Sequence, residues 1–552
     1  MYVVHPNHAP RKLTRVSATS FTLSTFARVD DPFTSSSLYP SAVEFHGGRL
    51  FYASPSSKVT TIYSSKVGSF DDHSLSPIDD ESALQVTIAE ISQKIEWLFS
   101  GDNSLIVGSS DGIVAVNGGG VGVAITAGTV EATITSAEPC NSAKPFRKDG
   151  FVFYVSVDGR SLRYLEYSLL KEAFQASDAN FLSYDITQKG IQKIRYKKDK
   201  NDIISCVLGE SSNGMITCNF NKDENIIGWH NHKTEYVDTS GSISDIAVIT
   251  DNTSRQRLFS LLKVGNDYFI TRQSEYVEFV ERVDFFTNDE KTDEEAYIRK
   301  VSEQLKECIY LDQSLTLSNL QEQQGTYDSI SGTFTDTDGV FVAGDVGKSI
   351  VYKTITGYES GRFKITAVNT ANEVDVDVIQ EPTDNVYSSW YLTFSSLTGL
   401  SDYDNTTVSV VLDGGYLSDF FITGGALELG RDATSIVIGY RYKGVIKSFT
   451  LGFNIQGVDT QKGKKVLSNF GVRCVSTAGL KVGSSLYRLE DVQKLSLPAI
   501  NYLPTKLIDG TAFVGFTDGY NRDKNFYIVQ DLPLPATITA VILTARYSID
   551  RG

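Results

Sequence analysis

The sequence is poor in cysteine, and its cysteines are not closely paired. They are odd in number, scattered, and never in a C-x-x-C arrangement: Cys140, Cys206, Cys218, Cys308 and Cys474. Such a set excludes a disulfide-stapled scaffold, although Cys206 and Cys218 flank an expected hairpin and could face each other. We therefore expect buried free thiols, in a chain made and folded in a reducing cytosol.

Long apolar runs are missing as well. No stretch is long enough to span a bilayer, so we expect no stable membrane insertion. Met1–Arg15 is polar and unlike a secretory signal peptide, because it carries His5, His8, Arg11, Lys12 and Arg15.

An excess of positive charge is the third absence. The formal net charge is −16 and the pI is about 5.0. An acidic chain gains no affinity by releasing counterions from DNA, which argues against tight sequence-specific binding. The same charge suits a surface that DNA passes without sticking, but it is also common among soluble proteins.

Signatures of catalysis are lacking too. There is no nucleophile elbow, Walker loop or Rossmann fingerprint, and no helix follows Gly118–Gly120 to bind phosphate. Ser109–Gly112 resembles a fragment of the Asp-box turn of sialidase propellers, but it lacks the following aromatic residue and occurs once. A glycosidase needs two carboxylates roughly 5–10 Å apart, which sequence cannot place among 67 acidic residues. We predict a protein that is not an enzyme and has no cofactor.

One histidine pair is the strongest candidate for a metal site. In Gly228–His232, His230 and His232 would lie on one face of a strand. Two ligands do not complete a site, and no acidic or cysteine ligand is obviously placed to join them. We favour the interpretation that Trp229 packs in the core while the histidines cap a strand end, and we predict no metal.

What the sequence does contain is a repeated β-hairpin. Each copy is a β-rich run, a polar turn and a second β-rich run, with about fifty residues between copies. Asp-Gly and Asn-Gly turns allow positive φ and join twisted antiparallel strands. Regular hairpins at this period favour a propeller-like array. The copies are Glu44–Ala53, Ser100–Val116, Phe151–Tyr167, Ile191–Phe220 and Ser242–Arg272.

Other segments divide the rest of the chain. Met1–Asp31 reads as an extended lead-in whose apolar anchors are Phe21, Leu23 and Phe26. Thr292–Glu295 is a capping box, followed by an apolar stripe at helical spacing: Tyr297, Val301, Leu305 and Cys308.

The segments predict a fold that is mainly β. We expect a β-propeller-like hairpin array over 1–286, one connecting helix over 287–309, and a β-platform over 310–552 with an inserted small β-barrel over 329–394. In that insert, Glu373–Ile379 alternates between acidic and apolar residues.

Two basic clusters stand out against the acidic background. Arg195, Lys197, Lys198 and Lys200 lie at a hairpin tip beside Tyr196, and Lys462–Lys465 forms the second cluster. A solvated loop is the ordinary interpretation. If the first loop faces a lumen, its residues form a DNA-facing or partner-binding site.

A series of segments resembles the tail nozzle (tail tubular protein B-like) proteins of short-tailed bacteriophages. The similar segments occur in the family's order from about Met1 to Tyr442, and Ile227–Thr234 with Ser242–Ile249 is the strongest match. The others are Val4–Arg15, Tyr39–Leu50, Ile62–Phe70, Ile95–Leu98, Leu105–Gly108, Leu162–Ser168, Tyr310–Leu315 and Val408–Gly414.

The resemblance implies a subunit of a homohexameric ring below a tail adaptor protein. Such a ring is the distal channel of the virion tail, made in the host cytoplasm, through which double-stranded DNA is retained and then ejected without sequence specificity. Tail fibres are further expected partners, and 329–394 is a candidate contact for a fibre or the adaptor.

The chain departs from the family at its start. The family has a further N-terminal segment before the stretch that matches Val4–Arg15, and five repeats are few for a closed propeller. We expect a separate polypeptide or a neighbouring subunit to supply the missing strands. The main alternative function is a host-surface glycan-binding or glycan-hydrolysing propeller, and a channel-free adhesion module is a second.

Overall fold

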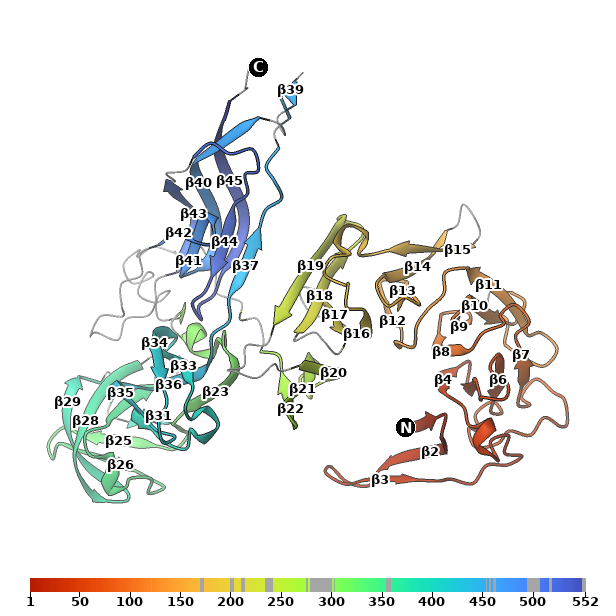
Figure 1. Cartoon of the computed structure of the whole chain (residues 1–552). Helices are drawn as coiled ribbons and strands as arrows, with labels where there is room; N and C mark the ends of the chain where they lie inside the picture. The colour runs from red at the N-terminus through yellow and green to blue at the C-terminus, as the bar shows by residue number, and fades with distance from the viewer. Residues whose placement is uncertain are drawn as a thin grey trace. The chain divides into compact units, whose positions relative to one another are not determined.

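The computed structural model describes most of the chain. The described residues are 1–120, 122–168, 173–198, 203–209, 214–233, 242–274, 277, 300–301, 303–353, 359–382, 384, 386–452, 454–455, 458–459, 463–493, 507–515 and 519–548. The fold is mainly β, as predicted (Figure 1). The chain divides into two compact units, Met1–Thr234 with Thr239–Gln273, and Glu235–Asp238 with Ser274–Gly552.

The first unit is a series of small antiparallel sheets in chain order. A three-stranded N-terminal sheet contains β1 (Tyr2–His5), β2 (His8–Arg15) and β3 (Phe21–Ser24). Five meander sheets follow. They are β4–β7 (Ala42–His46, Arg49–Ala53, Thr61–Ser64, Gln85–Thr87), β8–β11 (Ile95–Ser100, Leu105–Ser109, Gly112–Asn117, Glu131–Ser136), β12–β15 (Phe146–Lys148, Phe151–Val155, Leu162–Ser168, Ala173–Asp178), β16–β19 (Ile191–Lys197, Ile203–Leu208, Gly214–Asn221, Ile226–Lys233) and β20–β22 (Ser242–Thr250, Gln256–Val264, Asp267–Arg272).

Turn chemistry explains the hairpins that the sequence predicted. Gly47 and Gly48 join β4 to β5 with φ of 53° and 75°, and Gly159 joins β13 to β14 with φ of 73°. These values lie in the left-handed region, where glycine carries no steric penalty. Each repeat therefore marks two or three strands, and the other strands of each meander come from the segments between repeats.

Consecutive meander sheets share apolar cores. Phe51, Leu98 and Val114 belong to the core between the first and second sheets, and Phe153, Ile194 and Phe220 to the core between the third and fourth. Between the second and third, Trp97 packs directly over Gly108, where a Cβ atom would lie 2.2 Å from its ring. Sheets that meet face to face in chain order give the propeller-like character of this unit.

The lead-in differs from our expectation. Within residues 1–31, Tyr2–Ser24 forms the N-terminal sheet, and among the residues that the structure describes β3 pairs with β2 only. Phe21 is 58% and Leu23 is 49% exposed, so neither is an anchor. Phe26 is half-buried, with its ring 5.4 Å from that of Tyr2. The sheet packs on the first meander sheet through β1, and its far edge strand β3 leaves both its apolar side chains in water.

The first regular element described in the second unit is a helix. Residues 300–301 and 303–307 are helical, and Val301, Leu305 and Cys308 are buried together. That part of the predicted stripe is confirmed. The capping box at 292–295 and Tyr297 lie outside the described residues.

A platform sheet follows, with an inserted small β domain. The platform sheet contains β23 (Asp312–Ser318), β33 (Thr407–Leu412), β34 (Gly415–Phe421) and β36 (Ser435–Tyr440), and beside it β32 (Phe394–Leu397) pairs with β35 (Leu427–Ala433). The small β domain (320–392) contains β24 (Leu320–Gln321), β25 (Gly325–Asp328), β26 (Thr333–Asp336), β27 (Ser349–Lys353), β28 (Glu359–Thr370), β29 (Glu373–Gln380), β30 (Val386–Tyr387) and β31 (Trp390–Leu392).

The sheet of the small β domain curls around its own core. Its strands lie in the order β24-β31-β27-β28-β29-β26-β25-β30, so β30 and β31 follow each other in the chain but lie near opposite ends of the sheet. Tyr352 of β27 and Tyr387 of β30 have ring centroids only 3.9 Å apart. The barrel-like insert that we predicted is therefore present, and its sheet already begins at Leu320.

Two further sheets complete the second unit. One contains β37 (Gly444–Lys447), β41 (Leu480–Ser485), β42 (Arg488–Asp491) and β44 (Tyr527–Gln530), and the other contains β40 (Lys464–Thr477), β43 (Ile508–Gly515) and β45 (Thr537–Ser548). They share a core that includes Phe470, Val472 and Ile528. The remaining elements are the β38–β39 pair (Asn454–Ile455, Val458–Asp459) and 3-10 turns at Ser36–Leu38, Phe181–Ser183, Ala343–Asp345 and Ser401–Tyr403.

Candidate functional site

The first basic cluster lies at the end of β16, and the structure presents its charges unevenly. Lys197 is only 6% exposed, and Arg195 is half-buried, donating to the carbonyl of Ile194 at 2.7 Å. Tyr196 stacks on Phe146, with ring centroids 5.8 Å apart. Lys198 is exposed, and Lys200 lies outside the described residues. The assignment of this basic cluster as a DNA-facing loop stays a prediction. Lys198 is the described residue of the cluster that is best placed for such a contact.

The second cluster is split in the same way. Lys465 is fully buried and donates to the carbonyl of Arg522 at 3.0 Å, whereas Lys464 is exposed. Lys462 lies outside the described residues.

The histidine pair lies within β19, rather than at its end. Each ring bonds to a side chain of the neighbouring strand, His230 to Asn219 at 2.9 Å and His232 to Thr217 at 2.7 Å. Trp229 packs against the shared core and donates to the carbonyl of Ala179 at 3.0 Å, which confirms the expected packing role. Among the described residues, no three His, Cys, Asp or Glu side chains are grouped to hold a metal ion.

The Ser109–Gly112 turn has a structural role. One carboxylate oxygen of Asp111 accepts hydrogen bonds from the amides of Ser92 and Gln93 and from the hydroxyl of Ser92, at 2.7 to 2.9 Å. The hydroxyl bond from Ser92 is the main cause of the lowered pKa of Asp111. The carboxylate thus secures the turn and stays ionised.

All five cysteines are buried and free. Burial raises the pKa of Cys218 to about 12 and that of Cys308 to about 11. These thiols stay protonated at neutral pH and are poor nucleophiles.

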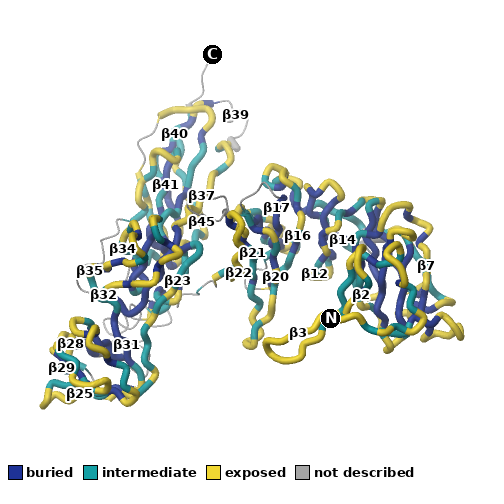
Figure 2. Tube along the Cα trace, turned by 60° about the horizontal axis from the view of Figure 1, so that its bottom comes forward, coloured by how far each residue is buried: buried dark blue, intermediate teal, exposed yellow. Residues whose placement is uncertain are grey.

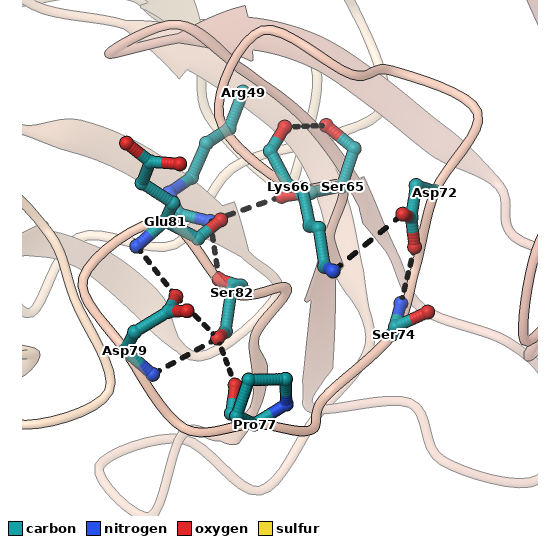
Figure 3. Close-up of polar contacts among 9 residues, drawn as sticks. All are labelled: Arg49, Ser65, Lys66, Asp72, Ser74, Pro77, Asp79, Glu81 and Ser82. Carbon is teal, nitrogen blue, oxygen red and sulfur yellow. Dashed lines mark hydrogen bonds and ion pairs between the residues drawn. The ribbon is translucent and has the colours of Figure 1, made fainter.

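The most elaborate polar arrangement surrounds Arg49, at the start of β5. Its side chain crosses into the loop between β6 and β7 (65–84), which we call the braced loop (Figure 3). The guanidinium donates to four backbone carbonyls of this loop: Ser65 at 3.1 Å, Asp80 at 2.6 Å, Glu81 at 3.3 Å and Ser82 at 2.5 Å.

Arg49 is only 2% exposed, and burial lowers its pKa. Since every acceptor is a carbonyl, the loop is held in shape by one cation rather than by a carboxylate pair. Asp79 reinforces it, because its carboxylate accepts from the Ser82 hydroxyl at 2.6 Å and the Glu81 amide at 3.0 Å.

The braced loop holds the N-terminal sheet. Val29 forms a parallel bridge with Asp72, and the amide of His73 donates to the carbonyl of Val29 at 3.0 Å. Asp71 accepts from the hydroxyl of Tyr2 at 2.8 Å and lies 3.6 Å from the ammonium of Lys12. Strands at the start of the chain are thereby tied to the first meander sheet.

His73 lies at the centre of this junction. It is 4% exposed, with its ring 5.8 Å from Phe33 and 5.6 Å from Tyr52. Among the described residues neither ring nitrogen has a hydrogen-bond partner. Burial, and then the nearby Arg28 guanidinium, lower its pKa. His73 is therefore neutral where it packs.

Two cavities border this region. One of about 360 Å³ is lined by Asp30, Pro32, Tyr63, Ser64, His73, Leu75, Ser76, Leu84 and Gln85, among which Asp30 is the single carboxylate. The other, of about 330 Å³, has Asp80 and Asp102 in its lining. Asp102 pairs with Arg147, which lowers its pKa, so it is not suited to act as the acid of a glycosidase.

A second notable feature is the unequal burial of third strands in the meander sheets. All four residues of β6 and five of the six in β10 are buried. In β22, the third strand of the last meander sheet, no residue is buried. Tyr268, Phe269 and Ile270 are 58%, 45% and 80% exposed. Figure 2 shows this exposure along β22 and along β3.

Arg49, His73 and the exposed β22 edge were not singled out from the sequence. Arg49 lies within the Tyr39–Leu50 segment whose resemblance to nozzle proteins is described above, and that resemblance was the one available signal for it. The burial of His73 and the exposure of β22 depend on neighbouring strands, so no local pattern reveals them.

Comparisons with known proteins add little. No protein-family model and no curated protein matches the sequence. Among solved structures, the chain is similar to a Bacteroides uniformis protein named for 6-phosphogluconolactonase activity, with 11% identity, a TM-score of 0.32, and coverage of 49% of this chain and 80% of that one. A Lactobacillus plantarum protein has 9% identity, a TM-score of 0.31, and coverage of 67% and 95%. The extracellular domain of a hybrid two-component system from B. thetaiotaomicron has 11% identity, a TM-score of 0.26, and coverage of 68% and 40%.

Similarity at this level does not identify a function. Within the described part of the chain, no helix has both the length and the apolar character needed to cross a bilayer.

Proposed function

We propose that this chain is a structural subunit of the virion tail of a short-tailed bacteriophage, where it forms part of the distal DNA channel. One observation carries the proposal from the structure: the described part of the propeller-like array of the first unit begins and ends in exposed strands, β3 and β22. Exposed strand edges bearing large apolar side chains are sites of association in native proteins. A subunit with such ends is built to function in an assembly.

The proposed assembly is a homohexameric ring that contacts a tail adaptor and tail fibres. It is made in the host cytoplasm and incorporated into the tail. A separate polypeptide at the N-terminal region is a further proposed partner. The collinear segments from Met1 to Tyr442 that resemble nozzle proteins support this choice of assembly.

The mechanism is geometric and electrostatic rather than catalytic. Rigid β modules enclose double-stranded DNA, and each subunit brings a formal charge of −16. Repulsion between acidic walls and phosphates keeps moving DNA from binding. Because screening limits a charge's reach to about 8 Å at physiological salt, only residues that face the lumen act in this way.

Native mass spectrometry with negative-stain imaging tests the proposal. The purified chain is measured alone and after mixing with a tail adaptor, and we expect hexameric rings with a central bore in at least one sample. A monomer that persists in both samples would contradict the proposal. A glycan-binding and glycan-hydrolysis screen would then test the main alternative.

A further inference from the structure

The charge of the chain is divided along its length. Residues 443–552, which we call the end module, contain 14 Lys and Arg against 8 Asp and Glu, a formal net charge of +6. The preceding 442 residues contain 37 Lys and Arg against 59 Asp and Glu, a net charge of −22. A cationic module on an acidic chain favours contact with an anionic partner.

Two segments of the end module leave one sheet at the same end. Lys447 of β37 and Gly483 of β41 both pair with Tyr527 of the intervening strand β44 (Figure 1). Because β37 and β41 are both antiparallel to β44, they run in the same direction. Phe449 follows the end of β37, and Tyr487 lies at the turn of the β41–β42 hairpin. We call this end of the sheet the aromatic tip, and it consists of residues 447–449 and 486–488.

The aromatic tip exposes large apolar side chains to water. Phe449 is 93% and Tyr487 is 98% exposed, and Leu486 beside Tyr487 is exposed as well. On the adjoining strand β37, Val445 and Ile446 are also exposed. Apolar side chains gathered at one end of a sheet mark an interaction site, because their exposure to water is unfavourable.

Positive charge accompanies these apolar side chains. Lys447 and Arg488 are exposed, and neither is taken up by an ion pair within the described part of the chain. The carboxylates of Glu490 and Asp491 lie further along β42, away from the hairpin turn. In the described segment that leads into β44, residues 519–526, Asp523 is the one acidic residue and has a cation on either side in sequence. The aromatic tip is therefore both apolar and cationic.

An anionic lipid surface matches both properties. Anionic headgroups attract Lys and Arg, and Phe and Leu side chains enter the boundary between headgroups and acyl chains. Tyrosine suits the same boundary because its ring is apolar and its hydroxyl is polar. A nucleic acid would pair with the cations and stack on the rings, but it offers no apolar phase to Val445, Ile446 and Leu486.

We propose that the aromatic tip docks this protein on the surface of an anionic lipid bilayer. The contact is peripheral, in keeping with the expected lack of stable membrane insertion. Rings and aliphatic side chains enter the headgroup boundary while Lys447 and Arg488 contact the phosphates. The inference goes beyond the proposed function and does not depend on it.

Vesicle flotation of the full chain tests the docking. One sample contains vesicles of phosphatidylethanolamine and phosphatidylglycerol in equal parts, and the other contains phosphatidylcholine vesicles. We expect binding to the anionic vesicles to exceed binding to phosphatidylcholine by about tenfold or more, since Lys and Arg are attracted to a negative surface. Added salt should weaken it because salt screens exposed charges.

Substitution of the two rings tests the apolar part of the contact. Phe449→Ser/Tyr487→Ser should lower binding to the anionic vesicles by about tenfold, because less apolar area enters the boundary. The matched control is Phe181→Ser/Ile330→Ser, which should bind as wild type does, because both residues are exposed but lie outside the end module. Circular dichroism and hydrogen exchange show whether each variant is folded.

Reversal of the two charges tests the electrostatic part. Lys447→Glu/Arg488→Glu should lower binding by about tenfold and reduce its dependence on salt. Lys58→Glu/Arg160→Glu changes the net charge equally at exposed positions outside the end module, and it should retain binding. The pair of variants separates the place of the charges from their sum.

A fluorescent reporter shows whether the tip enters the lipid. The three native tryptophans pack in or against the cores of other sheets, so Phe449→Trp adds one exposed indole. We expect its emission to shift to the blue with anionic vesicles and to be quenched by brominated lipid. Binding without shift or quenching would mean that the rings stay in water, against the proposal.

Other outcomes also overturn the inference. Failure of the folded chain to bind anionic vesicles would refute it, as would equal binding by the ring variant and wild type. Binding of an oligonucleotide through the same residues, without vesicle binding, would assign the tip to nucleic acid instead. Rings with a central bore that bind no vesicles would refute this inference and leave the proposed function standing, whereas monomers that bind vesicles through the tip would do the reverse.

Discussion

The small β domain (320–392) and the propeller-like array of the first unit bury their side chains in different ways. The small β domain curls one sheet around a single core, in which Phe334, Phe363 and Trp390 are fully buried. The array instead divides its apolar residues among cores shared by adjacent sheets. A curled sheet supplies its own neighbours, whereas each sheet of an array depends on the next one.

The difference is clearest at β22, the last described strand of the array. Within the described part of the array, the third strand β10 is buried against the neighbouring sheets, whereas no residue of the third strand β22 is buried. The β22 sequence is not unusually polar, so its position in the fold rather than its composition sets its exposure. The small β domain completes its own core, whereas the array depends on contacts between adjacent sheets.

The largest effect is expected in the small β domain, for Trp390→Ala. Trp390 is fully buried, with its ring 5.1 Å from Phe334 and 5.4 Å from Phe341. Its removal leaves a large cavity in a core that no second sheet can fill, which we expect to reduce the local free energy of unfolding by ~3–5 kcal/mol. Hydrogen exchange followed by mass spectrometry over 320–392 measures this loss.

The control for this prediction is Ile330→Ala in the same domain, because Ile330 is 95% exposed. Protection should change little in that variant. If Trp390→Ala also destabilised the meander sheets to the same extent, the two regions would form one cooperative unit and the comparison would fail.

The next largest effect is expected at the braced loop, for Arg49→Met. The substitution retains most of the side chain's volume but leaves four backbone carbonyls without their donor. Hydrogen bonds to a charged group contribute about 1.5–3 kcal/mol, so we expect a loss of ~2–3 kcal/mol in the first unit. Hydrogen exchange of residues 65–84 reports it.

Arg49→Lys separates charge from geometry at the same position. A lysine retains the cation but cannot reach four carbonyls in a fixed fork, so partial recovery is expected. Full recovery would mean that charge alone braces the loop.

Sequence reasoning succeeded where local patterns determine the structure. The Gly47–Gly48 and Asp158–Gly159 turns predicted real hairpins, and Val301, Leu305 and Cys308 do form a buried stripe. The repeats found in the sequence, however, cover mainly strands that have a neighbouring strand on both sides. Outer strands such as β7 and β11 are short or half-exposed, so they carry no strong apolar alternation.

Sequence reasoning failed where burial depends on distant contacts. Phe21 and Phe33 look alike as isolated aromatic residues, yet Phe21 is 58% exposed and Phe33 is 2% exposed. Phe33 is buried because it meets Tyr52 and Tyr63 from later strands. Likewise, Lys197 belongs to a basic run but is buried, because β16, an edge strand of its own sheet, lies against β12 and β20 of the neighbouring sheets.

A smaller, pH-dependent effect is expected where the N-terminal sheet meets the braced loop. The pKa of His73 is lowered in the folded state, so below its unfolded value of about 6.5 the unfolded chain binds a proton that the folded chain does not. The contribution of neutral His73 to the free energy of unfolding is therefore fully present above about pH 6.5. It is lost as the pH falls, with a slope of at most about 1.4 kcal/mol per pH unit.

His73→Phe removes the titrating group and should flatten this slope, while the free energy of unfolding near pH 8 changes little. Hydrogen exchange of residues 2–33 between pH 5 and 8, corrected for intrinsic exchange rates, measures it. An equal slope in wild type and variant would assign the pH dependence to other groups.

The smallest effect is expected at the open end of the array, for Ile270→Thr in the isolated chain. Ile270 is 80% exposed, and surface substitutions of this kind usually change stability by less than about 0.5 kcal/mol. Its matched counterpart is Val114→Thr in β10, since Val114 is fully buried in the core between two meander sheets and its replacement places a hydroxyl there. We expect that variant to lose ~1–3 kcal/mol because the hydroxyl is desolvated.

Thermal unfolding at low protein concentration, where subunits are separate, compares the two variants. Similar losses at both positions would mean that β22 is covered in solution, and the distinction between a buried and an open third strand would no longer hold.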